Sequence, residues 1–261
     1  MSLSRIKAII MQELYITQNS IEVMVDLFYY SIVTVIAWGF ISLYLAGTSN
    51  KIAGHLLIGM ILWEIIRIVQ YSISVGALWN IWSKNLSNMF IAPLSLAEYM
   101  TAQLISGVVK ALAMFLVIST LSTFLFNFNI FQLGIANLLI YFLNLTIFAW
   151  AIGLIILAFI FRYGPRIQAL AWGLIFIFQP LTAVFFPVKI LPTILQKLSY
   201  FIPATHIFEA ARGNLTNPSI NWNLISIAFL ENIVYLIVSL WFFNFMFNKS
   251  KESGQFAKNE G

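Results

Sequence analysis

Long runs of apolar residues alternate with short polar segments along the chain. The hydrocarbon core of a bilayer is about 30 Å thick, and a helix needs roughly 20 consecutive apolar residues to cross it. Runs of this kind predict six spanning helices, at about 25–46, 54–78, 98–126, 133–161, 167–186 and 222–247. The runs are continuous rather than alternating, which favours helices over a β-barrel. The pattern therefore predicts an all-α polytopic membrane protein.

Composition supports this interpretation. Of 261 residues, 61% are hydrophobic and 9% are charged, whereas soluble domains are about half apolar and about a quarter charged. So few polar residues cannot cover a water-facing surface, which excludes a soluble globular protein, a disordered chain and a nucleic-acid-binding protein. Cysteine is absent, and the two histidines, His55 and His206, are too far apart in the sequence to predict a metal site.

The segment 3–20, before the first run, has a mixed pattern. Apolar residues recur at helical spacing, with polar residues between them: Leu3, Ile6, Ile10 and Leu14 against Arg5, Lys7, Gln12 and Glu13. This spacing predicts an amphipathic helix lying in the membrane interface, and a frayed leader is the alternative. A cleavable signal peptide fits badly, because the apolar run that follows is too long for one.

Lysine and arginine in the loops predict the orientation. With the N-terminus inside, eight basic residues fall in cytoplasmic segments: Arg5, Lys7, Lys84, Arg162, Arg166, Lys249, Lys251 and Lys258. Four fall in outer segments: Lys51, Lys189, Lys197 and Arg212. We therefore expect both termini in the cytoplasm, with residues 1–248 forming the membrane domain and residues 249–261 a polar, disordered cytoplasmic tail.

The connector between the second and third runs, residues 79–97, has its own periodicity. Trp82, Leu86, Met89 and Phe90 fall on one face of a helix, with polar residues largely opposite and Pro93 ending it. The pattern predicts a short amphipathic helix. It does not decide between an interfacial anchor and a docking surface for a cytoplasmic partner.

A proline-rich stretch, 187–221, follows the fifth run. Pro187, Pro192, Pro203 and Pro218 delimit two short apolar helices, at about 191–202 and 204–212. Each is too short to cross the bilayer. They suggest a hairpin that dips into the outer leaflet, or a loop folded over the spans.

Charged residues inside the spans are costly and are by default functional candidates. Glu64 and Arg67 lie three residues apart and are expected to neutralise each other. Lys110 and Glu231 have no partner within their own spans, so pairing across the third and sixth spans is expected; the alternative is that either lines a polar pathway. Outside the spans, Glu209 and Arg212 are expected to form a plain pair on a helix surface.

The sequence carries no recognisable catalytic arrangement. It has neither a Gly-x-Ser-x-Gly nucleophile motif nor a phosphate-binding loop of the form Gly-x-x-x-x-Gly-Lys-Ser/Thr. If this chain takes part in active transport, ATP must be hydrolysed on another chain.

Three stretches, in this order, resemble the permease subunit of type-2 ATP-binding cassette (ABC) exporters over nearly the whole chain. They are 81–86 leading to 92–95 and Glu98; 162–166 leading to Ala171-Trp172; and 179–187 with 191–192 and 203–212 after it. The third is the most specific. It departs mildly from the family pattern, with Thr182 where serine is usual and Phe186 where tyrosine is frequent.

The resemblance implies roles for these segments. The N-terminal helix would lie on the inner leaflet, and residues 188–213 would form re-entrant outer helices that close the pathway, including Pro187, Pro192, Pro203, Glu209 and Arg212. Arg162 and Arg166 would lie in the second cytoplasmic loop. The coupling helix that docks on the ATPase would comprise Trp82, Lys84, Asn85, Leu86, Met89 and Phe90.

The resemblance also implies partners and a mechanism. A permease homodimer and two ATPases would form the complex in the cytoplasmic membrane, with the pathway at the permease–permease interface. ATP and magnesium would bind to the ATPase, so this chain would hold no cofactor and would not be an enzyme. The family exports drugs, lipid-linked glycans, polysaccharides and other hydrophobic molecules. The alternative is a secondary transporter that uses Lys110, Glu64 or Glu231 as an ion relay.

Overall fold

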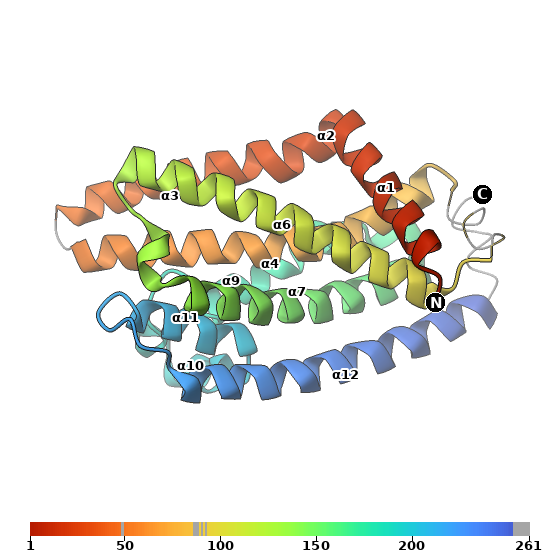
Figure 1. Ribbon diagram of the computed structural model, residues 1–261. Helices are drawn as coiled ribbons and strands as arrows, with labels where there is room; N and C mark the ends of the chain where they lie inside the picture. Colours follow the sequence, from red (N-terminus) through yellow and green to blue (C-terminus); the bar gives the residue numbers. More distant parts are fainter. Residues whose placement is uncertain (48–49, 86–88, 90, 92, 253–261) are drawn as a thin grey trace.

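The computed structural model describes residues 1–47, 50–85, 89, 91 and 93–252, and this part of the chain forms helices and turns without a strand. The long helices lie side by side in one elongated bundle (Figure 1). The first half of the bundle comprises α1 (Leu3–Asn19), α2 (Ile21–Met24), a π-helical turn η1 (Val25–Tyr29), α3 (Tyr30–Ala46), α4 (Asn50–Trp82) and α6 (Leu96–Phe126).

The second half begins with the 3₁₀ turn η2 (Ile130–Leu133) and the long helix α7 (Ile135–Tyr163). Short elements follow: η3 (Gly164–Ile167), α8 (Ala169–Gly173), α9 (Ile175–Leu181), η4 (Val188–Ile190), α10 (Thr193–Ser199) and α11 (Pro203–Gly213). The long helix α12 (Trp222–Glu252) completes the described chain.

Five helical stretches in the described residues are long and apolar enough to cross a membrane: Ile21–Ala46, Ile52–Trp82, Leu96–Phe126, Ile135–Ile167 and Trp222–Glu252. Each coincides with a span expected from the apolar runs. The remaining expectation, one continuous helix over 167–186, is wrong. Pro180 cannot donate a backbone hydrogen bond, and α9 ends one residue later at Leu181. The apolar helical stretch is limited to Ala169–Leu181.

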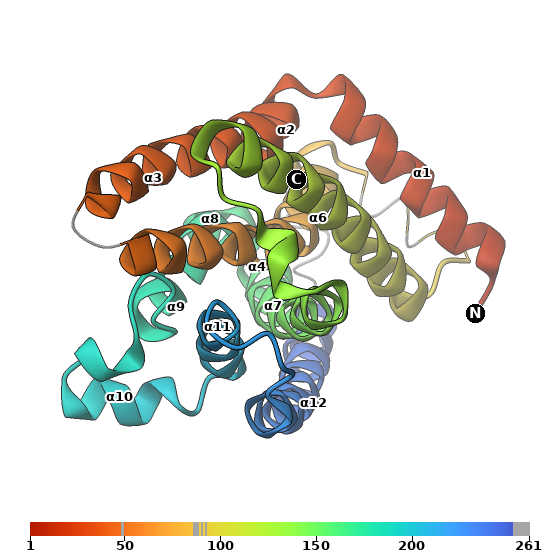
Figure 2. The ribbon, with the colours of Figure 1, turned by 60° about the vertical axis from the view of Figure 1, so that its left-hand side comes forward.

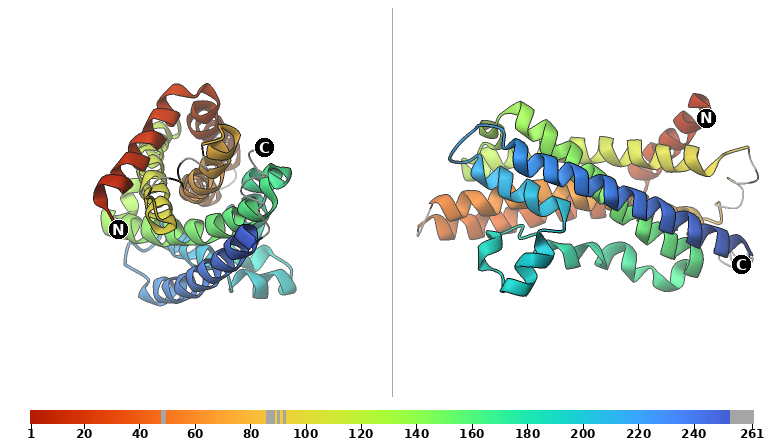
Figure 3. Two further views of the ribbon diagram at one scale, coloured as in Figure 1. Left: turned by 90° about the vertical axis from the view of Figure 1, so that its right-hand side faces the viewer. Right: turned by 90° about the horizontal axis from the view of Figure 1, so that it is seen from below.

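The centre of the bundle is formed by α4 and α7. Most residues of these two helices are buried, whereas few residues of α3 and α12 are buried. Figure 2 shows α4 between α3, α6 and α7, and the end-on view of Figure 3 shows it surrounded by the other helices. The apolar exposed faces of α3 and α12 therefore lie on the outside of the bundle, where lipid or another apolar surface covers them.

Helix α1 lies across the bundle rather than along it (Figure 3). Its buried residues are Ile6, Ile9, Glu13 and Thr17, which follow helical spacing. Of the apolar residues in the predicted pattern, Ile6 is buried against the bundle, whereas Leu3 is 84% exposed and Leu14 is 42% exposed. The face that packs against the bundle thus contains a glutamate instead of only apolar side chains.

The C-terminal end of α12 corrects the predicted boundary of the tail. Residues 248–252 are helical rather than disordered. The hydroxyl of Ser250 donates a 2.6 Å hydrogen bond to the carbonyl of Phe161 and is buried there. This contact ties the last turns of α12 to the end of α7, while residues 253–261 lie outside the described residues.

Candidate functional site

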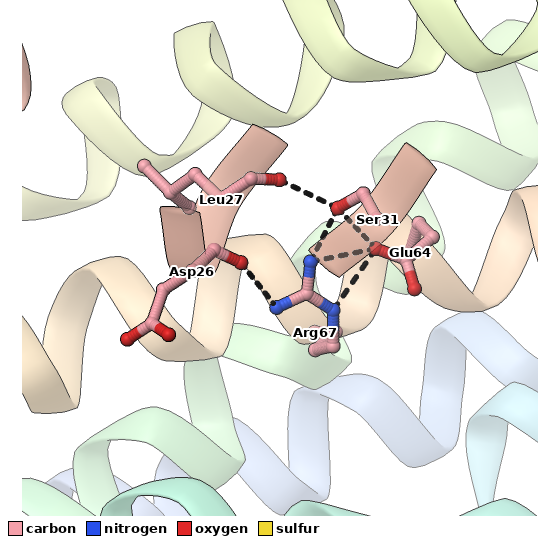
Figure 4. A network of polar contacts seen from close by, with 5 residues as sticks. All are labelled: Asp26, Leu27, Ser31, Glu64 and Arg67. Atoms are coloured by element: carbon pink, nitrogen blue, oxygen red, sulfur yellow. Dashed lines mark hydrogen bonds and ion pairs between the residues drawn. The ribbon is translucent and has the colours of Figure 1, made fainter. Parts of the chain in front are cut away.

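The charged residues of the second span meet the first span in a buried cluster, drawn in Figure 4. The Glu64 Oε2 and Arg67 Nη2 atoms are 2.7 Å apart, which confirms the expected pair. The Ser31 hydroxyl lies 2.7 Å from Glu64 Oε2, and Arg67 Nη1 donates to the backbone carbonyl of Asp26 at 3.3 Å. That carbonyl belongs to the π-helical turn η1, an irregularity that is common at functional sites.

Lys110 does not pair with Glu231. Its Nζ atom lies 3.2 Å from Oε2 of Glu13, and Gln103 donates to the other oxygen of that carboxylate at 2.8 Å. The expected pairing is wrong because α1 folds onto α6, whereas α12 packs mainly against α7 and α11. Glu13 is 3% exposed, so this network lies inside the protein.

Three further contacts attach α1 to the bundle. The backbone amide of Ser2 donates to Glu98 Oε1 at 2.6 Å, and Arg5 Nη1 lies 3.5 Å from Glu98 Oε2. The side chain of Gln12 donates to Asn80 Oδ1 at 3.0 Å. Contacts at Glu98 and Glu13 join α1 to α6, and the Gln12 contact joins it to α4, so α1 is fastened to two of the long helices.

Glu231 of α12 contacts His206 of α11 instead. The His206 Nε2 atom lies 3.4 Å from Glu231 Oε1 and 3.1 Å from the backbone carbonyl of Tyr200. Both neighbours are acceptors, so Nε2 carries the proton. The contact connects the α10–α11 turn to α12.

Arg212 and Glu209 form the expected ion pair, with Nη2 and Oε1 2.9 Å apart, but the pair is not a plain surface contact. Arg212 is 4% exposed, and its Nη1 donates to the backbone carbonyls of Ala183 and Val184 at 2.8 and 3.3 Å. The Glu209 carboxylate accepts from the amide of Val188 at 2.8 Å. Burial lowers the pKa of the Arg212 guanidinium, and the adjacent Glu209 carboxylate opposes that change.

The segment held by Arg212 is irregular backbone that lies directly against α4. Ala183 has a positive φ of 52°, which is unusual for a residue with a side chain. A Cβ atom at Gly59 of α4 would lie 2.0 Å from the carbonyl oxygen of Val184, so glycine is required there. The ring of Phe185 stacks on Trp38 of α3, with centroids 4.2 Å apart.

The three prolines expected in this outer segment each precede or begin a helical turn. Pro187 precedes η4, Pro192 precedes α10, and Pro203 is the first residue of α11. Proline is favoured at such positions because the first turn of a helix does not need its amide. Helix α11 is buried, packing on α12, α7 and α4.

The predicted coupling helix is interrupted in the described residues. Trp82 is the last residue of α4, and Lys84 has a positive φ of 53°, so the chain turns there. Trp82 and Met89 therefore do not share one continuous helix, and the expected face is wrong in that respect. Trp82 is 39% exposed, and Met89 is buried. Asn85 donates from its backbone amide to the carbonyl of Asn80 at 2.9 Å; Leu86 and Phe90 lie outside the described residues.

Trp82 packs against two other tryptophan rings. Its ring centroid is 5.3 Å from that of Trp79 and 6.1 Å from that of Trp172 in α8. In the second loop, Arg162 donates to the carbonyl of Lys249 at 2.9 Å, and Arg166 is exposed in η3. The end of α4 is thereby in contact with α8, and the end of α7 with α12.

Sequence reasoning missed the residues that complete these networks. Glu13 follows Ile6 and Ile9 at helical spacing, a signal that would have placed it on the buried face of α1. For His206 and Gln103 no comparable signal existed, because their partners come from distant segments. Groups of acidic residues and histidines arranged to hold a metal ion are absent from the described residues.

A family model described as ABC-2 type transporter matches residues 14–216. The match covers most of the chain, which therefore belongs to this family. The protein is a multi-pass membrane permease of the ABC type, and its family implies pairing with an ABC ATPase subunit. Membrane domains of this family are not themselves catalytic. A comparison with curated proteins gave no match.

Proposed function

We propose that this chain is the permease subunit of an ABC exporter that moves a hydrophobic, lipidic or glycan-type substrate or a drug across the cytoplasmic membrane. ATP is hydrolysed on a separate subunit that binds ATP and magnesium. The observation that carries the proposal is the family match over residues 14–216 in a chain with spanning helices and no phosphate-binding loop.

Ion-coupled transport through the intramembrane charges is not favoured. Each residue proposed for the relay has a partner: Lys110 contacts Glu13, Glu64 contacts Arg67, and Glu231 contacts His206. A relay residue needs access to a polar pathway. These contacts occupy the charged groups inside the helix bundle.

The proposed topology has six crossings with both termini in the cytoplasm. The start of α1 and the end of α12 lie at the same end of the bundle (Figure 1), and the α8–α9 segment leads the chain back towards the opposite end (Figure 3). Basic residues are more frequent in the segments assigned to the cytoplasmic side. Reporter fusions at Lys84 and Gly164 should report inside, and a cytoplasmic fusion at Ser199 would contradict the proposal.

The outer segment 188–213 is proposed to be a re-entrant hairpin that closes the pathway. Large apolar residues around α10 are exposed: Ile190, Ile194, Leu198 and Phe201. Helix α11, by contrast, is buried in the bundle. Exposed apolar side chains on one short helix and burial of the next suit a hairpin seated in the outer leaflet, with its backbone covered by protein.

Trp82 and the connector after it are proposed to contact the ATPase, and two permeases with two ATPases to form the complex. Movement of the ATPases would reach the spans through α4, which ends at Trp82, and through α8, whose Trp172 packs on it. The aromatic contacts support this route, because they join the connector to the second span and to the segment after the second loop.

Co-purification of the permease with an ABC ATPase subunit expressed from the same organism tests the proposal. Trp82→Ala should lower ATPase recovery, normalised to permease in the membrane, because truncating an aromatic anchor commonly costs about 2 kcal/mol or more. Trp241→Ala is the matched control, since Trp241 is 66% exposed on α12. Failure of the wild-type permease to recover any ATPase, or to stimulate transport with it in vesicles, would overturn the proposed function.

A further inference from the structure

A cavity of about 220 Å³ opens between the first span, the second span and the α8–α9 segment. Its wall combines aromatic rings with charged groups: Asp26, Tyr30, Arg67, Tyr71, Trp172 and Phe176. Tyr30 is 47% exposed and Phe176 is 38% exposed, so these two rings lie at its mouth. Tyr71 is buried and Trp172 is half-buried, which places them deeper.

The Asp26 carboxylate is the distinctive group of this cavity. Its Oδ2 atom accepts hydrogen bonds from the Tyr71 hydroxyl at 3.0 Å and from Trp172 Nε1 at 3.4 Å. Both donors are neutral, and they come from two other segments of the bundle. Within the part of the chain that the structure describes, Oδ1 accepts no hydrogen bond and the carboxylate makes no ion pair. The site therefore orients a carboxylate without neutralising it.

The neighbouring arginine does not provide the missing charge. Arg67 directs Nε and Nη2 to Glu64, at 2.9 and 2.7 Å, and Nη1 to the backbone carbonyl of Asp26. Figure 4 shows the carboxylate of Asp26 turned away from the guanidinium. Glu64 and Arg67 cancel, so the cavity keeps one net negative charge. A charge without an ion-pair partner is costly within a membrane and is therefore a functional candidate.

The aromatic wall complements that charge. An ammonium group over an aromatic face is attracted by the negative face of the ring, and tryptophan and tyrosine are the strongest such rings. The ring of Tyr30 already has the Arg67 guanidinium carbon 5.2 Å from its centroid. A cation entering past Tyr30 and Phe176 would meet Trp172 and then the free oxygen of Asp26.

We propose that this cavity binds the ammonium head group of a hydrophobic organic cation, and that such cations are the substrate class of the permease. This inference rests on the proposed function and narrows its substrate. A sugar fits less well, because it needs both donors and acceptors. The donors of Tyr71, Trp172 and Arg67 face partners in the protein, whereas an ammonium needs only an acceptor and aromatic faces.

The position of the cavity suits entry of the cation from the inner leaflet of the membrane. Tyr71 precedes Trp82, the end of α4, by eleven residues, or roughly 16 Å at 1.5 Å per residue. The cavity thus lies in the half of the bundle nearest the connector proposed to contact the ATPase. Its exposed mouth at Tyr30 and Phe176 is open to a hydrophobic cation that has partitioned into the membrane.

Binding of radiolabelled benzyltrimethylammonium to the full-length permease tests the site in nanodiscs of neutral phosphatidylcholine, without the ATPase. Asp26→Asn keeps the shape and the acceptor for Tyr71 but removes the charge, and it should weaken binding about tenfold or more. Glu22→Gln is the matched control, because it removes an exposed carboxylate from the preceding turn and should leave binding unchanged. Trp172→Leu should weaken binding about threefold to tenfold through loss of the ring.

The uncharged isostere neopentylbenzene separates charge recognition from simple hydrophobic binding. Neopentylbenzene should compete poorly with the cation in the wild type. Its own affinity should be the same in the wild type and in Asp26→Asn, because it carries no charge. Equal cation affinity in both proteins, or competition by neopentylbenzene as strong as that by the cation itself, would overturn the inference. The binding assay contains no ATPase, so either outcome would reject the cation site alone. The proposed permease function is tested separately, by co-purification with the ATPase.

Discussion

Two buried polar networks stabilise the two ends of this bundle. One joins side chains to side chains, and the other joins a side chain to backbone carbonyls. At the end with α1, side chains contact side chains: Glu13 meets Lys110 and Gln103 between regular helices. At the other end, Arg212 contacts the backbone carbonyls of residues 183–184, where the chain is irregular. Both networks are buried, but only the second satisfies main-chain groups that have no helical partner.

The difference follows from the solvent around the protein. In a regular helix every interior backbone group is already bonded, so the first network serves only to fix α1 against α6. After Leu181 the helix has ended, and carbonyls at that depth find no water. A donor must come from the protein, and Arg212 supplies it. We therefore expect the network at Arg212 to matter more for folding than the network at Glu13.

The largest effect is expected for Arg212→Met. The substitution leaves the Glu209 carboxylate and the carbonyls of residues 183–184 without their shared donor, and breaking a buried pair costs about 3–5 kcal/mol. Thermal unfolding in detergent, followed by size-exclusion chromatography, should show a large loss of folded protein. Lys197→Met is the control in the same segment, because Lys197 is exposed. Equal melting of the two variants would contradict a structural role for Arg212.

A smaller loss, about 2–3 kcal/mol, is expected for Lys110→Met. The Lys110 side chain is 12% exposed, against 4% for Arg212, and Lys110 contacts only a side chain, whereas the loss of Arg212 also leaves two backbone carbonyls without their donor. Adding Glu13→Gln should restore part of the loss, because the unpaired charge is removed as well. Combining Lys110→Met with Glu231→Gln instead should lower the free energy of unfolding by the sum of the two single losses. A smaller loss in this double variant than in Lys110→Met alone would contradict the contact between Lys110 and Glu13.

Gly59→Ala should cost about 2 kcal/mol by forcing the backbone of residue 184 away from α4. The added Cβ would lie 2.0 Å from the carbonyl oxygen of Val184. At Gly213 an added Cβ meets nothing within 4 Å, which makes Gly213→Ala the control. The same melting assay measures both. A Gly59→Ala protein as stable as Gly213→Ala would show that the segment does not need its close approach to α4.

The smallest effect, about 1 kcal/mol, is expected for His206→Leu, which removes the donor that contacts Glu231 and the carbonyl of Tyr200. His206→Gln keeps an N–H donor and should recover about half of that loss. The comparison is made by the same unfolding measurement. If the glutamine variant melts no higher than the leucine variant, the contacts with Tyr200 and Glu231 do not stabilise this end of the bundle.

Much of the fold was predictable because its causes are local. Five spans match the apolar runs, since the thickness of the bilayer sets their length. Glu64 and Arg67 pair as expected, because three residues along a helix place them on one face. The fifth run does not form a single helix, and Pro180 within it is a sequence signal for the break.

The sequence alone determined that this is an all-helical membrane protein, where its spans lie, and which residues of one helix are neighbours. The tertiary structure decided which helices meet. Only the fold of α1 onto α6 made Glu13 the partner of Lys110, and only the packing of three segments placed Tyr71 and Trp172 at Asp26. The physical reason is that lipid-facing helices are all similarly apolar, so hydrophobicity specifies their depth but not their neighbours.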